Sequence, residues 1–525
     1  MFRRITFTLV VLATLAKPQA TFKTGTRLVQ MDVTVTNDSG AVRGLTKDDF
    51  ILEDKGKKQD IAVFATTDMA KAMSVETLPA GIASNYLNSK GEQQQTATVI
   101  LYDKINTAAS DQATTRQQVL GYLAKLKDTD RVGFYSLGFQ LSMVREYNEE
   151  AAPLVKMAKL LIAGGNAEGL SAEEQTLYKS LNDALTPMQQ LANQARVNVT
   201  YPMFKTLARH LSGVSGRKNL VWVASVFPLT YGNSQDRRKN DEQEVNSFKA
   251  VLTENNITVY PIDPGGTGAS FAVSDAAPAV DEGGLMKTRG GSVAAPANSI
   301  PSTSPTSLTG NQTFQMLASV TGGKAFRNSN DITQALREVI ESSTFTYTLG
   351  FYPDEKTLDG REHKLEVKLV KKPATDKAKV SSRKEYVAWG PKSPADVQMR
   401  PALGEVLADV LPASGVGMIA VSNPDPAKPG YSKLDVRVTI HDLKFEQLAD
   451  KWAGAFDMGV GIAGTQGGAV ETFSPVWTND EYQRALKENL IVSKSIQTDG
   501  KAGVFNVVVQ DKASGAAGSI KVPFK

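Results

Sequence analysis

Unbroken apolar runs alternate with helical segments between residues 97 and 260, and this alternation constrains the fold more than any other feature of the chain. Val99 to Tyr102 and Leu220 to Val223 lack a polar interruption, and Ile257 to Tyr260 contains a single threonine. Strands of a parallel sheet have this pattern because helices bury both of their faces. Between the runs, apolar residues recur at the spacing of one helix face, as at Phe204, Leu207, Ala208 and Leu211. The pattern predicts a doubly wound α/β sheet.

Segments with a period of two flank this region and predict β-structure. In residues 31–36 apolar and polar side chains alternate, which indicates a half-buried strand in an N-terminal β segment over residues 25–70. The same period returns over residues 345–390, and we expect these strands to pair with the N-terminal segment. Alternation resumes at residues 434–440 and predicts a separate β-sandwich-like domain over residues 392–525.

The α/β domain itself is expected to span residues 96–345 and to carry two insertions. Residues 151–195 are rich in Ala, Leu, Glu and Gln, which favours an additional helical excursion. Residues 264–311 are dominated by Gly, Ala, Ser, Pro and Thr, and such a segment buries too little apolar surface to offset its ordering entropy. We expect a loop there, and a linker between residues 68 and 95.

The first twenty residues predict export. Arg3 and Arg4 precede the apolar run Ile5 to Ala16, and small residues follow at Ala16 and Ala20, as in a secretory signal peptide over residues 1–20. The run is shorter than the ~20 residues that span a bilayer, so a retained anchor is the weaker alternative. We expect a periplasmic or secreted protein with no membrane span after cleavage.

Composition limits the chemistry and the partners. The 525 residues are 41% hydrophobic and 22% charged, as in soluble folded domains. The absence of cysteine excludes disulfides, zinc–thiolate sites and cysteine nucleophiles. The formal charge of +4 includes three cations of the predicted signal, so the remainder is nearly neutral. Such a balance gives no reason to expect nucleic acid as a partner.

Catalytic motifs are not found. The three histidines, His210, His363 and His441, lie in different segments. We expect His210, near a helix end, and His363, at a polar strand start, to have exposed or capping roles. Nucleophile elbows, phosphate loops and paired histidines on a helix are missing from the sequence. The prediction is therefore a protein that is not an enzyme; a hydrolase with an unrecognised carboxylate pair is the alternative.

The loop from Asp103 to Thr107 is the strongest candidate for a site. Ligands of doubly wound sheets bind beyond the carboxyl ends of the strands, where the strand order reverses, and Asp103 lies at such an end. The loop Asp103-Lys104-Ile105-Asn106-Thr107 resembles the first metal motif of von Willebrand A domains, Asp-x-Ser-x-Ser, whose oxygen atoms suit a hard cation such as Mg²⁺. Asp103 and Thr107 match this motif, whereas Ile105 does not.

In that family a second loop provides a Thr and a later strand end provides an Asp. Thr200 is a loose match for the Thr, but Ala224-Ser225 stands where the second Asp belongs. The sequence therefore predicts a degenerate metal site with no cofactor, in which Asp103 caps a turn and Thr107 packs locally. Mg²⁺ binding by Asp103, Thr107 and Thr200 is the alternative.

A wider resemblance covers most of residues 25 to 390. It is carried by five segments: Val29 to Phe64, Val99 to Thr107, Asp130 to Gly138, Gly216 to Pro228 (GRKNLVWVASVFP) and Tyr347 to Pro353 (YTLGFYP). In order and spacing they resemble the secreted VWFA-related domain family of Acidobacteria. The resemblance implies a Rossmann-like von Willebrand A-type domain with flanking β-rich domains, and an Asp-x-x-Asn-Thr loop in place of the full metal motif. It implies no defined reaction.

Binding is the function that these features favour. We expect an exported adhesion or scaffold protein that contacts a protein or cell-surface partner through the loop face of Asp103, Asn106, Thr107 and Ser225. A Mg²⁺-dependent adhesin, which a chelator would inactivate, is one alternative. A structural envelope protein, which would co-purify with cell-surface material, is another.

Overall fold

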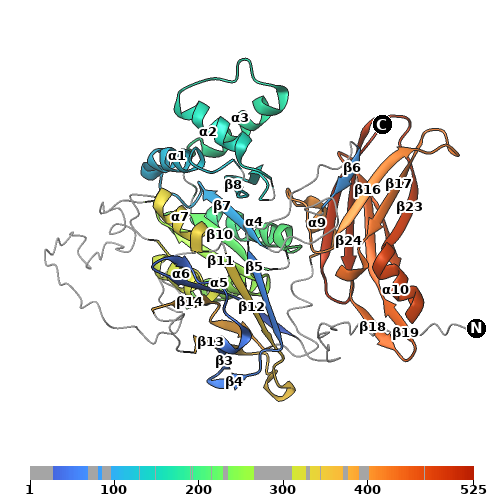
Figure 1. Ribbon diagram of the computed structural model, residues 1–525. Helices are drawn as coiled ribbons and strands as arrows, with labels where there is room; N and C mark the ends of the chain where they lie inside the picture. The colour runs from blue at the N-terminus through green and yellow to red at the C-terminus, as the bar shows by residue number, and fades with distance from the viewer. Residues whose placement is uncertain are drawn as a thin grey trace, which may run out of the picture.

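The computed structural model places an α/β domain between two β-sandwiches (Figure 1). It describes residues 28–68, 81–85, 96–128, 130–147, 149–189, 191, 193–214, 216–228, 235–264, 310–326, 332–342, 345–370, 377–388, 401–465 and 467–525. The predicted signal peptide and nearly all of the predicted insertion 264–311 lie outside these residues. Within them, no helix is both long and apolar enough to cross a membrane.

The α/β domain is built on a sheet with the strand order β11-β10-β7-β8-β9. β7, β8, β10 and β11 are parallel, whereas β9 runs antiparallel to β8. Counted along the chain the order is 5-4-1-2-3, so the winding direction reverses between β7 and β10, as in a doubly wound sheet. The strands are β7 (Ala97–Asp103), β8 (Gly133–Leu137), β9 (Leu141–Arg145), β10 (Lys218–Val223) and β11 (Ile257–Ile262).

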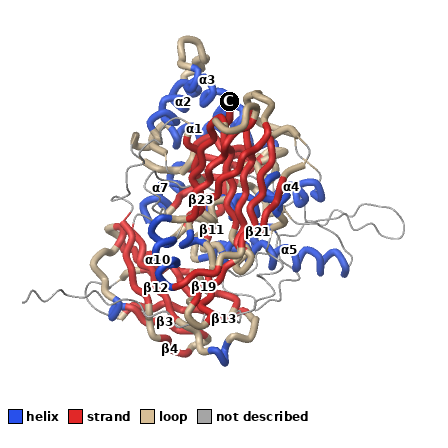
Figure 2. Tube along the Cα trace, turned by 90° about the vertical axis from the view of Figure 1, so that its right-hand side faces the viewer, coloured by secondary structure: helices blue, strands red, loops and turns tan. Residues whose placement is uncertain are grey.

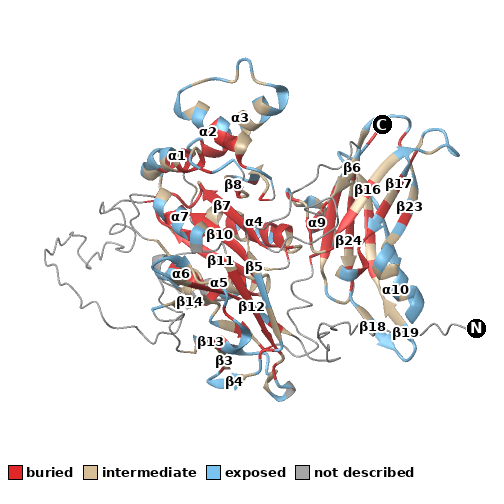
Figure 3. Ribbon diagram, viewed as in Figure 1, coloured by how far each residue is buried: buried red, intermediate tan, exposed pale blue. Residues whose placement is uncertain are grey.

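Helices cover both faces of this sheet, which explains its unbroken apolar strands. Val99, Leu101 and Trp222 belong to the core on one face, together with residues of α4 (Asn193–Leu211), α5 (Gln235–Glu254) and α6 (Gly310–Thr321). Ile100 and Tyr102 belong to the core on the other face, with α1 (Ala109–Leu123) and α7 (Ile332–Ser342). Successive residues of a strand point to opposite faces, so apolar residues follow one another in the middle of β7 and β10. These strands are buried along their whole length (Figure 3).

Within the predicted insertion 151–195, residues 152–185 form a helical excursion above α1 (Figure 1). Its helices are α2 (Ala152–Ile162) and α3 (Ala172–Leu185). α3 begins with a capping box, in which the Ser171 hydroxyl accepts the N–H of Glu174 and the Glu174 carboxylate accepts the N–H of Ser171. Leu154, Leu181 and Leu185 join the core on the α1 face, so the excursion is packed onto the domain.

The N-terminal sandwich combines residues from both ends of the α/β domain. One sheet has the order β14-β1-β12-β5, with β2 on β1, and the other has the order β15-β13-β3-β4. Met31 and Val33 of one sheet and Leu52 of the other share a core that is completed by Tyr347 and Leu349. The elements are β1 (Val29–Asn37), β2 (Gly40–Ala41), η1 (Lys47–Asp49), β3 (Phe50–Asp54), β4 (Lys57–Gln59), β5 (Val63–Asp68), β12 (Phe345–Phe351), η4 (Glu355–Thr357), β13 (Glu362–Leu369), β14 (Lys379–Ser382) and β15 (Glu385–Val387).

The C-terminal sandwich faces the viewer in Figure 2 and packs the sheet β23-β17-β16-β6 against the sheet β21-β20-β24-β25. A small sheet β18-β19-β22 and α10 adjoin it. The elements are β6 (Ile82–Ser84), α9 (Leu403–Ala408), β16 (Met418–Pro424), β17 (Tyr431–Val438), η6 (Ile440–Asp442), β18 (Phe445–Leu448), β19 (Lys451–Gly454), β20 (Phe456–Ile462), β21 (Ala469–Phe473), β22 (Val476–Thr478), α10 (Asn479–Glu488), β23 (Leu490–Gln497), β24 (Gly503–Asp511) and β25 (Ala517–Phe524).

The expectation of a plain linker over residues 68–95 is wrong for residues 82–84. These residues form β6, which pairs antiparallel with β16 through Val421, Ala420 and Ile419. Asn85 follows and donates to the carbonyl oxygens of Ala413 and Val416, each at 2.8 Å. Three residues are too short a run to show a period in the sequence.

The end of α4 is bonded to the segment that enters the C-terminal sandwich. Arg209 donates from Nε to Oδ2 of Asp409 at 2.7 Å and from Nη2 to Oδ1 at 2.8 Å. The N–H of Gly213 donates to the Ser414 hydroxyl at 2.8 Å. A Cβ at position 213 would lie 2.4 Å from the Ser414 carbonyl oxygen, so this approach requires glycine.

Candidate functional site

The loop from Asp103 to Thr107 leaves the carboxyl end of β7 beside the end of β10. β7 pairs with β10 on one side and with β8 on the other, so the loop lies where the strand order reverses. Asp103, Asn106, Thr107 and Ile105 are all fully buried. The sequence placed these residues correctly on the sheet, but they are covered by protein and do not line an open face.

The Asp103 carboxylate is the centre of a hydrogen-bond network. Its Oδ1 accepts the backbone N–H of Asn106 at 3.0 Å, which closes a tight turn. Its Oδ2 accepts the Asn106 side-chain amide at 2.7 Å and the indole N–H of Trp222 at 2.9 Å. Three N–H donors therefore stabilise one buried negative charge.

The other predicted site residues join this network at different points. Thr200, on α4, accepts the Asn106 side-chain amide at 2.9 Å. Thr107 donates from its hydroxyl to the backbone carbonyl of Asp103 at 2.6 Å. The backbone N–H of Ser225 donates to the Asn106 carbonyl at 2.9 Å, and its hydroxyl accepts the N–H of Ala108 at 3.2 Å. The five residues named from the sequence thus gather around one loop.

Two residues of this network were not assigned to it from the sequence. Trp222 lies in the apolar run Leu220 to Val223, which indicates only a place in the core, and its indole ring packs there against Phe204 at 4.5 Å between ring centroids. Gln112, on α1, was not singled out. It donates to the carbonyl oxygens of Lys104 and Thr107 and accepts the N–H of Met188, so it joins the loop to the segment after α3. The polarity of Gln112 on a core-facing helix position was the available signal.

Burial dominates the electrostatics of Asp103. It raises the pKa of the carboxyl, whereas the donors of Asn106 and Trp222 and the positive charge of Arg196 lower it; the result is about 6. Burial also lowers the pKa of the neighbouring Lys104, which donates to the Asp183 carbonyl at 3.0 Å.

The donor set does not fit Mg²⁺. This ion requires near-octahedral oxygen ligands and usually at least one accessible carboxylate. N–H donors occupy both oxygens of Asp103, and the Thr107 hydroxyl is turned toward a backbone carbonyl. Among the described residues, no group of three His, Cys, Asp or Glu side chains is arranged to hold a metal ion.

The expectation that His210 and His363 are exposed or cap an element is wrong. Each is only 1% exposed, and each contacts a carboxylate: His210 Nε2 lies 3.0 Å from Glu146, and His363 Nδ1 lies 3.0 Å from Asp54. His441 is exposed. The buried histidines join distant chain segments, and no local pattern around either histidine indicates its partners.

Comparisons with known proteins leave the family open. No family model matches the chain, and no curated protein matches it. Among solved structures, the human COPII-coat protein Sec24c is 8% identical, with 57% of this chain and 44% of that chain covered and a TM-score of 0.27. The chain thus spans less than half of that protein's length. An aerotolerance-related membrane protein from Bacteroides fragilis is 12% identical, with 47% and 97% covered and a TM-score of 0.22.

A third solved structure, the conserved hypothetical protein BatB from Bacteroides thetaiotaomicron, is 14% identical, with 47% of this chain and 98% of that chain covered and a TM-score of 0.21. TM-scores at this level do not establish a shared fold. The fold of the α/β domain is therefore described by its own strand order and helix arrangement.

Proposed function

We propose that the chain is an exported von Willebrand A-type scaffold that binds a protein partner without a metal ion. The observation that carries the proposal is that N–H donors contact both carboxylate oxygens of Asp103, the residue that would hold a cation in the full motif. Asn106 and Trp222 donate hydrogen bonds to the buried carboxylate, which supports a loop that keeps its shape with no ion. The doubly wound strand order and the position of the loop at the reversal point support the A-type assignment.

A binding role is supported by an exposed apolar side chain beside this loop. Phe139, between β8 and β9, is 71% exposed. The loop that carries it adjoins the candidate site, because the N–H of Lys104 donates to the Leu137 carbonyl at 3.0 Å. Met143 on β9 is also exposed. Aromatic residues, Phe among them, are enriched in the cores of protein interfaces.

Two measurements test this proposal. The first is titration of the full chain with Mg²⁺ and Mn²⁺ by calorimetry, with Asp103→Ala as the reference; no heat of binding is expected for either protein. Metal binding that Asp103→Ala abolishes would show instead that the chain is a metal-dependent adhesin.

The second measurement is retention of envelope proteins on the immobilised full chain, with and without EDTA. We expect a protein to be retained equally with and without EDTA, and we expect Phe139→Asp to abolish its retention. Leu448→Asp is the matched control, because Leu448 is 60% exposed on the C-terminal sandwich, away from the loop. The proposal would be contradicted if both variants lost the retained protein equally, or if EDTA released it. Turnover of a substrate would indicate an enzyme instead.

A further inference from the structure

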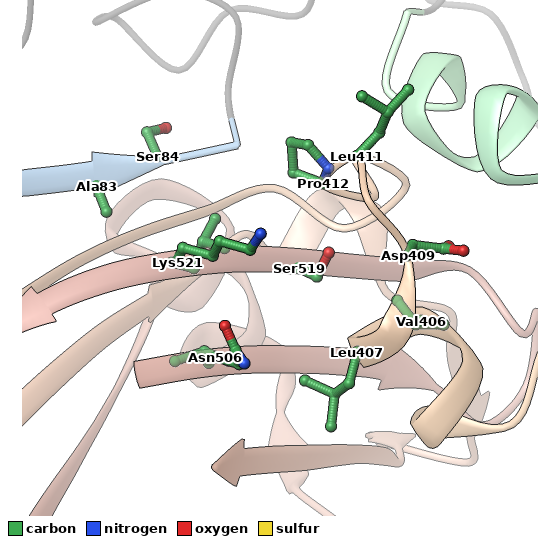
Figure 4. Close-up of a pocket in the computed structure, with 12 residues that line it drawn as sticks. Ala83, Ser84, Val406, Leu407, Asp409, Leu411, Pro412, Asn506, Ser519 and Lys521 are labelled. Carbon is green, nitrogen blue, oxygen red and sulfur yellow. The ribbon is translucent and has the colours of Figure 1, made fainter. Parts of the chain in front are cut away.

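A pocket lies where α9 crosses the outer face of the C-terminal sandwich. Its volume is about 140 Å³. The side chains around it come from separate parts of the chain: Val406 and Leu407 from α9, Leu411 from the connection that follows, and Asn506 and Lys521 from β24 and β25 (Figure 4). Ala83 and Ser84 of β6 close it on another side.

Two polar side chains of the pocket are left without partners. The Oδ1 atom of Asn506 is buried and accepts no hydrogen bond in the structure. An unsatisfied buried polar atom costs about 1–3 kcal/mol, so a group that donates to it would be stabilised. Lys521 is exposed at the edge of the pocket, and its ammonium group forms no ion pair with the described residues.

Asn506 and Lys521 are direct partners across β24 and β25, so both extend from the same face of the sheet. Side chains paired in this way start about 5 Å apart at Cβ. Figure 4 shows both reaching toward the space under β6 and the connection that follows α9. One ligand with two neighbouring polar groups can therefore meet both.

The remaining polar groups of the pocket are already satisfied. The Asp409 carboxylate accepts from Arg209 and Thr206 on α4. The Ser519 hydroxyl accepts the N–H of Ala413 at 2.9 Å, and the Ser84 hydroxyl donates to the Met418 carbonyl at 3.1 Å. Since Arg209 neutralises Asp409, the pocket has the net positive charge of Lys521 and favours an anionic ligand.

The size and walls of the pocket select the apolar part of the ligand. An engineered cavity of about 150 Å³ with an apolar lining accepts a benzene molecule, so this pocket admits a group of similar size. Its apolar walls are Val406, Leu407 and Leu411. A branched aliphatic side chain fits this space and lining.

We propose that the pocket binds an aliphatic amino-acid residue with a free carboxylate. The carboxylate pairs with Lys521 Nζ, the adjacent N–H donates to Asn506 Oδ1, and the side chain packs against Val406, Leu407 and Leu411. The C-terminal residue of a peptide and a free amino acid both offer this chemistry. The pocket lies in the C-terminal sandwich, so the proposal does not depend on the function assigned to the α/β domain.

Calorimetry on the full chain tests it with N-acetyl-L-leucine, L-leucine and N-acetyl-L-leucinamide. N-acetyl-L-leucine is expected to bind, and loss of its carboxylate in the leucinamide is expected to weaken binding about tenfold or more, as for a charge-assisted hydrogen bond. Tighter binding of N-acetyl-L-leucine than of L-leucine identifies a peptide C-terminus as the ligand, and the reverse order identifies a free amino acid.

Variants separate the pocket from other surfaces. Lys521→Met is expected to weaken binding about tenfold or more, whereas Lys501→Met, at an exposed turn, leaves it unchanged. Leu407→Trp fills the pocket and is expected to abolish binding, and a retained unfolding transition shows that the variant is folded. The proposal is overturned by equal binding of the leucinamide, by an unchanged Kd in Lys521→Met, or by no binding of either carboxylate at millimolar concentration.

Discussion

The Nε2 nitrogen of His210 lies 3.0 Å from Oε2 of Glu146, and the histidine is buried where α4 meets the entry to the C-terminal sandwich. On the opposite side of the ring, Nδ1 lies 2.8 Å from the carbonyl oxygen of Pro412. Both partners are acceptors, so the protonated imidazole, which donates from both nitrogens, satisfies the site best. The Tyr135 hydroxyl donates to Glu146 Oε1 at 2.5 Å and completes the cluster.

This cluster predicts a pH-dependent stability. Burial lowers the pKa of His210, but the Glu146 charge, its hydrogen bond and the Pro412 carbonyl raise it more, so the net shift is upward. Burial raises the pKa of Glu146, but the His210 charge and the donors of His210, Tyr135 and Tyr147 lower it below its usual value. Glu149 and Tyr147 are the other titratable groups that act on the cluster.

The signs of the two shifts define the expected window. The stabilisation by His210 is complete below its ordinary pKa of 6.5 and is lost as the pH rises through the raised value. The stabilisation by Glu146 is complete above its ordinary pKa of 4.5 and is lost as the pH falls through the lowered value. The contribution of this pair to the free energy of unfolding, measured in urea across the pH range, should therefore be greatest between pH 4.5 and pH 6.5.

His210→Gln should remove the decline above pH 6.5, because glutamine keeps two hydrogen-bonding groups but cannot be protonated. The same profile for the exposed His441→Gln serves as the control and should match the parent chain. A decline that persists unchanged in His210→Gln would assign the pH dependence to other groups.

Trp222 is predicted to stabilise the charge of Asp103 in place of a cation. Trp222→Phe keeps the ring in the core but removes the N–H at 2.9 Å from Asp103 Oδ2. A hydrogen bond to a charged group contributes about 1.5–3 kcal/mol, so unfolding at neutral pH should become easier by that amount. Trp477→Phe is the matched control, since Trp477 stacks on Phe445. An equal fall in the free energy of unfolding in the two variants would contradict the role of the indole N–H.

The pH profile of Trp222→Phe gives a second check. The pKa of Asp103 in the folded chain is about 6, above its ordinary value of 3.8. The folded state therefore binds this proton more tightly than the unfolded state, and stability falls as the pH rises through about 6. Losing the indole donor should move this fall to higher pH and make it larger.

Metal addition or removal should leave stability unchanged. A ligand that binds only the folded state raises the unfolding temperature by mass action. Because N–H groups occupy the Asp103 oxygens, we expect equal unfolding temperatures in EDTA, Mg²⁺ and Mn²⁺. A rise with Mg²⁺ that disappears in Asp103→Ala would refute the metal-independent loop.

The sheet of the α/β domain was predictable because burial on both faces imposes an apolar run that local sequence shows directly. Val99 to Tyr102 and Leu220 to Val223 both form buried strands of one parallel sheet. β6 was not predictable in this way, since it is a strand only through pairing with β16, more than three hundred residues away. Its register depends on a partner that local periodicity does not show.

The position of the site on the sheet was predictable from the sequence, but the side chains that surround Asp103 were not. The place of Asp103 at a strand end indicated the loop, and the motif indicated Thr107 and Thr200 as neighbours. The indole donor of Trp222 could not be inferred, because a tryptophan in an apolar strand is usually explained by packing alone. Likewise, nothing near His210 in the sequence indicates Glu146 or Pro412, which the fold brings from distant segments.

Arg217 is predicted to join the N-terminal sandwich to the α/β domain. Only 1% of it is exposed, and its guanidinium donates to four acceptors from different segments. Nε donates to Asn219 at 2.9 Å, Nη1 to the Asp32 carbonyl at 3.3 Å, and Nη2 to the Tyr260 hydroxyl at 2.8 Å and to the Gly322 carbonyl at 3.1 Å. Asp32 belongs to β1 of the sandwich, whereas the other acceptors belong to the α/β domain or its edge.

Arg217→Met retains an unbranched apolar stem but removes the guanidinium donors from these buried acceptors. A buried polar atom left unsatisfied costs about 1–3 kcal/mol, so we expect the free energy of unfolding to fall by about that amount or more. Arg437→Met, on the exposed side of β17, is the control and should change stability little. Arg217→Lys keeps the positive charge but not the planar guanidinium group, so its free energy of unfolding should lie between those of Arg217→Met and the control. A free energy of unfolding equal to that of the control would show that Arg217 does not stabilise the contact between the sandwich and the α/β domain.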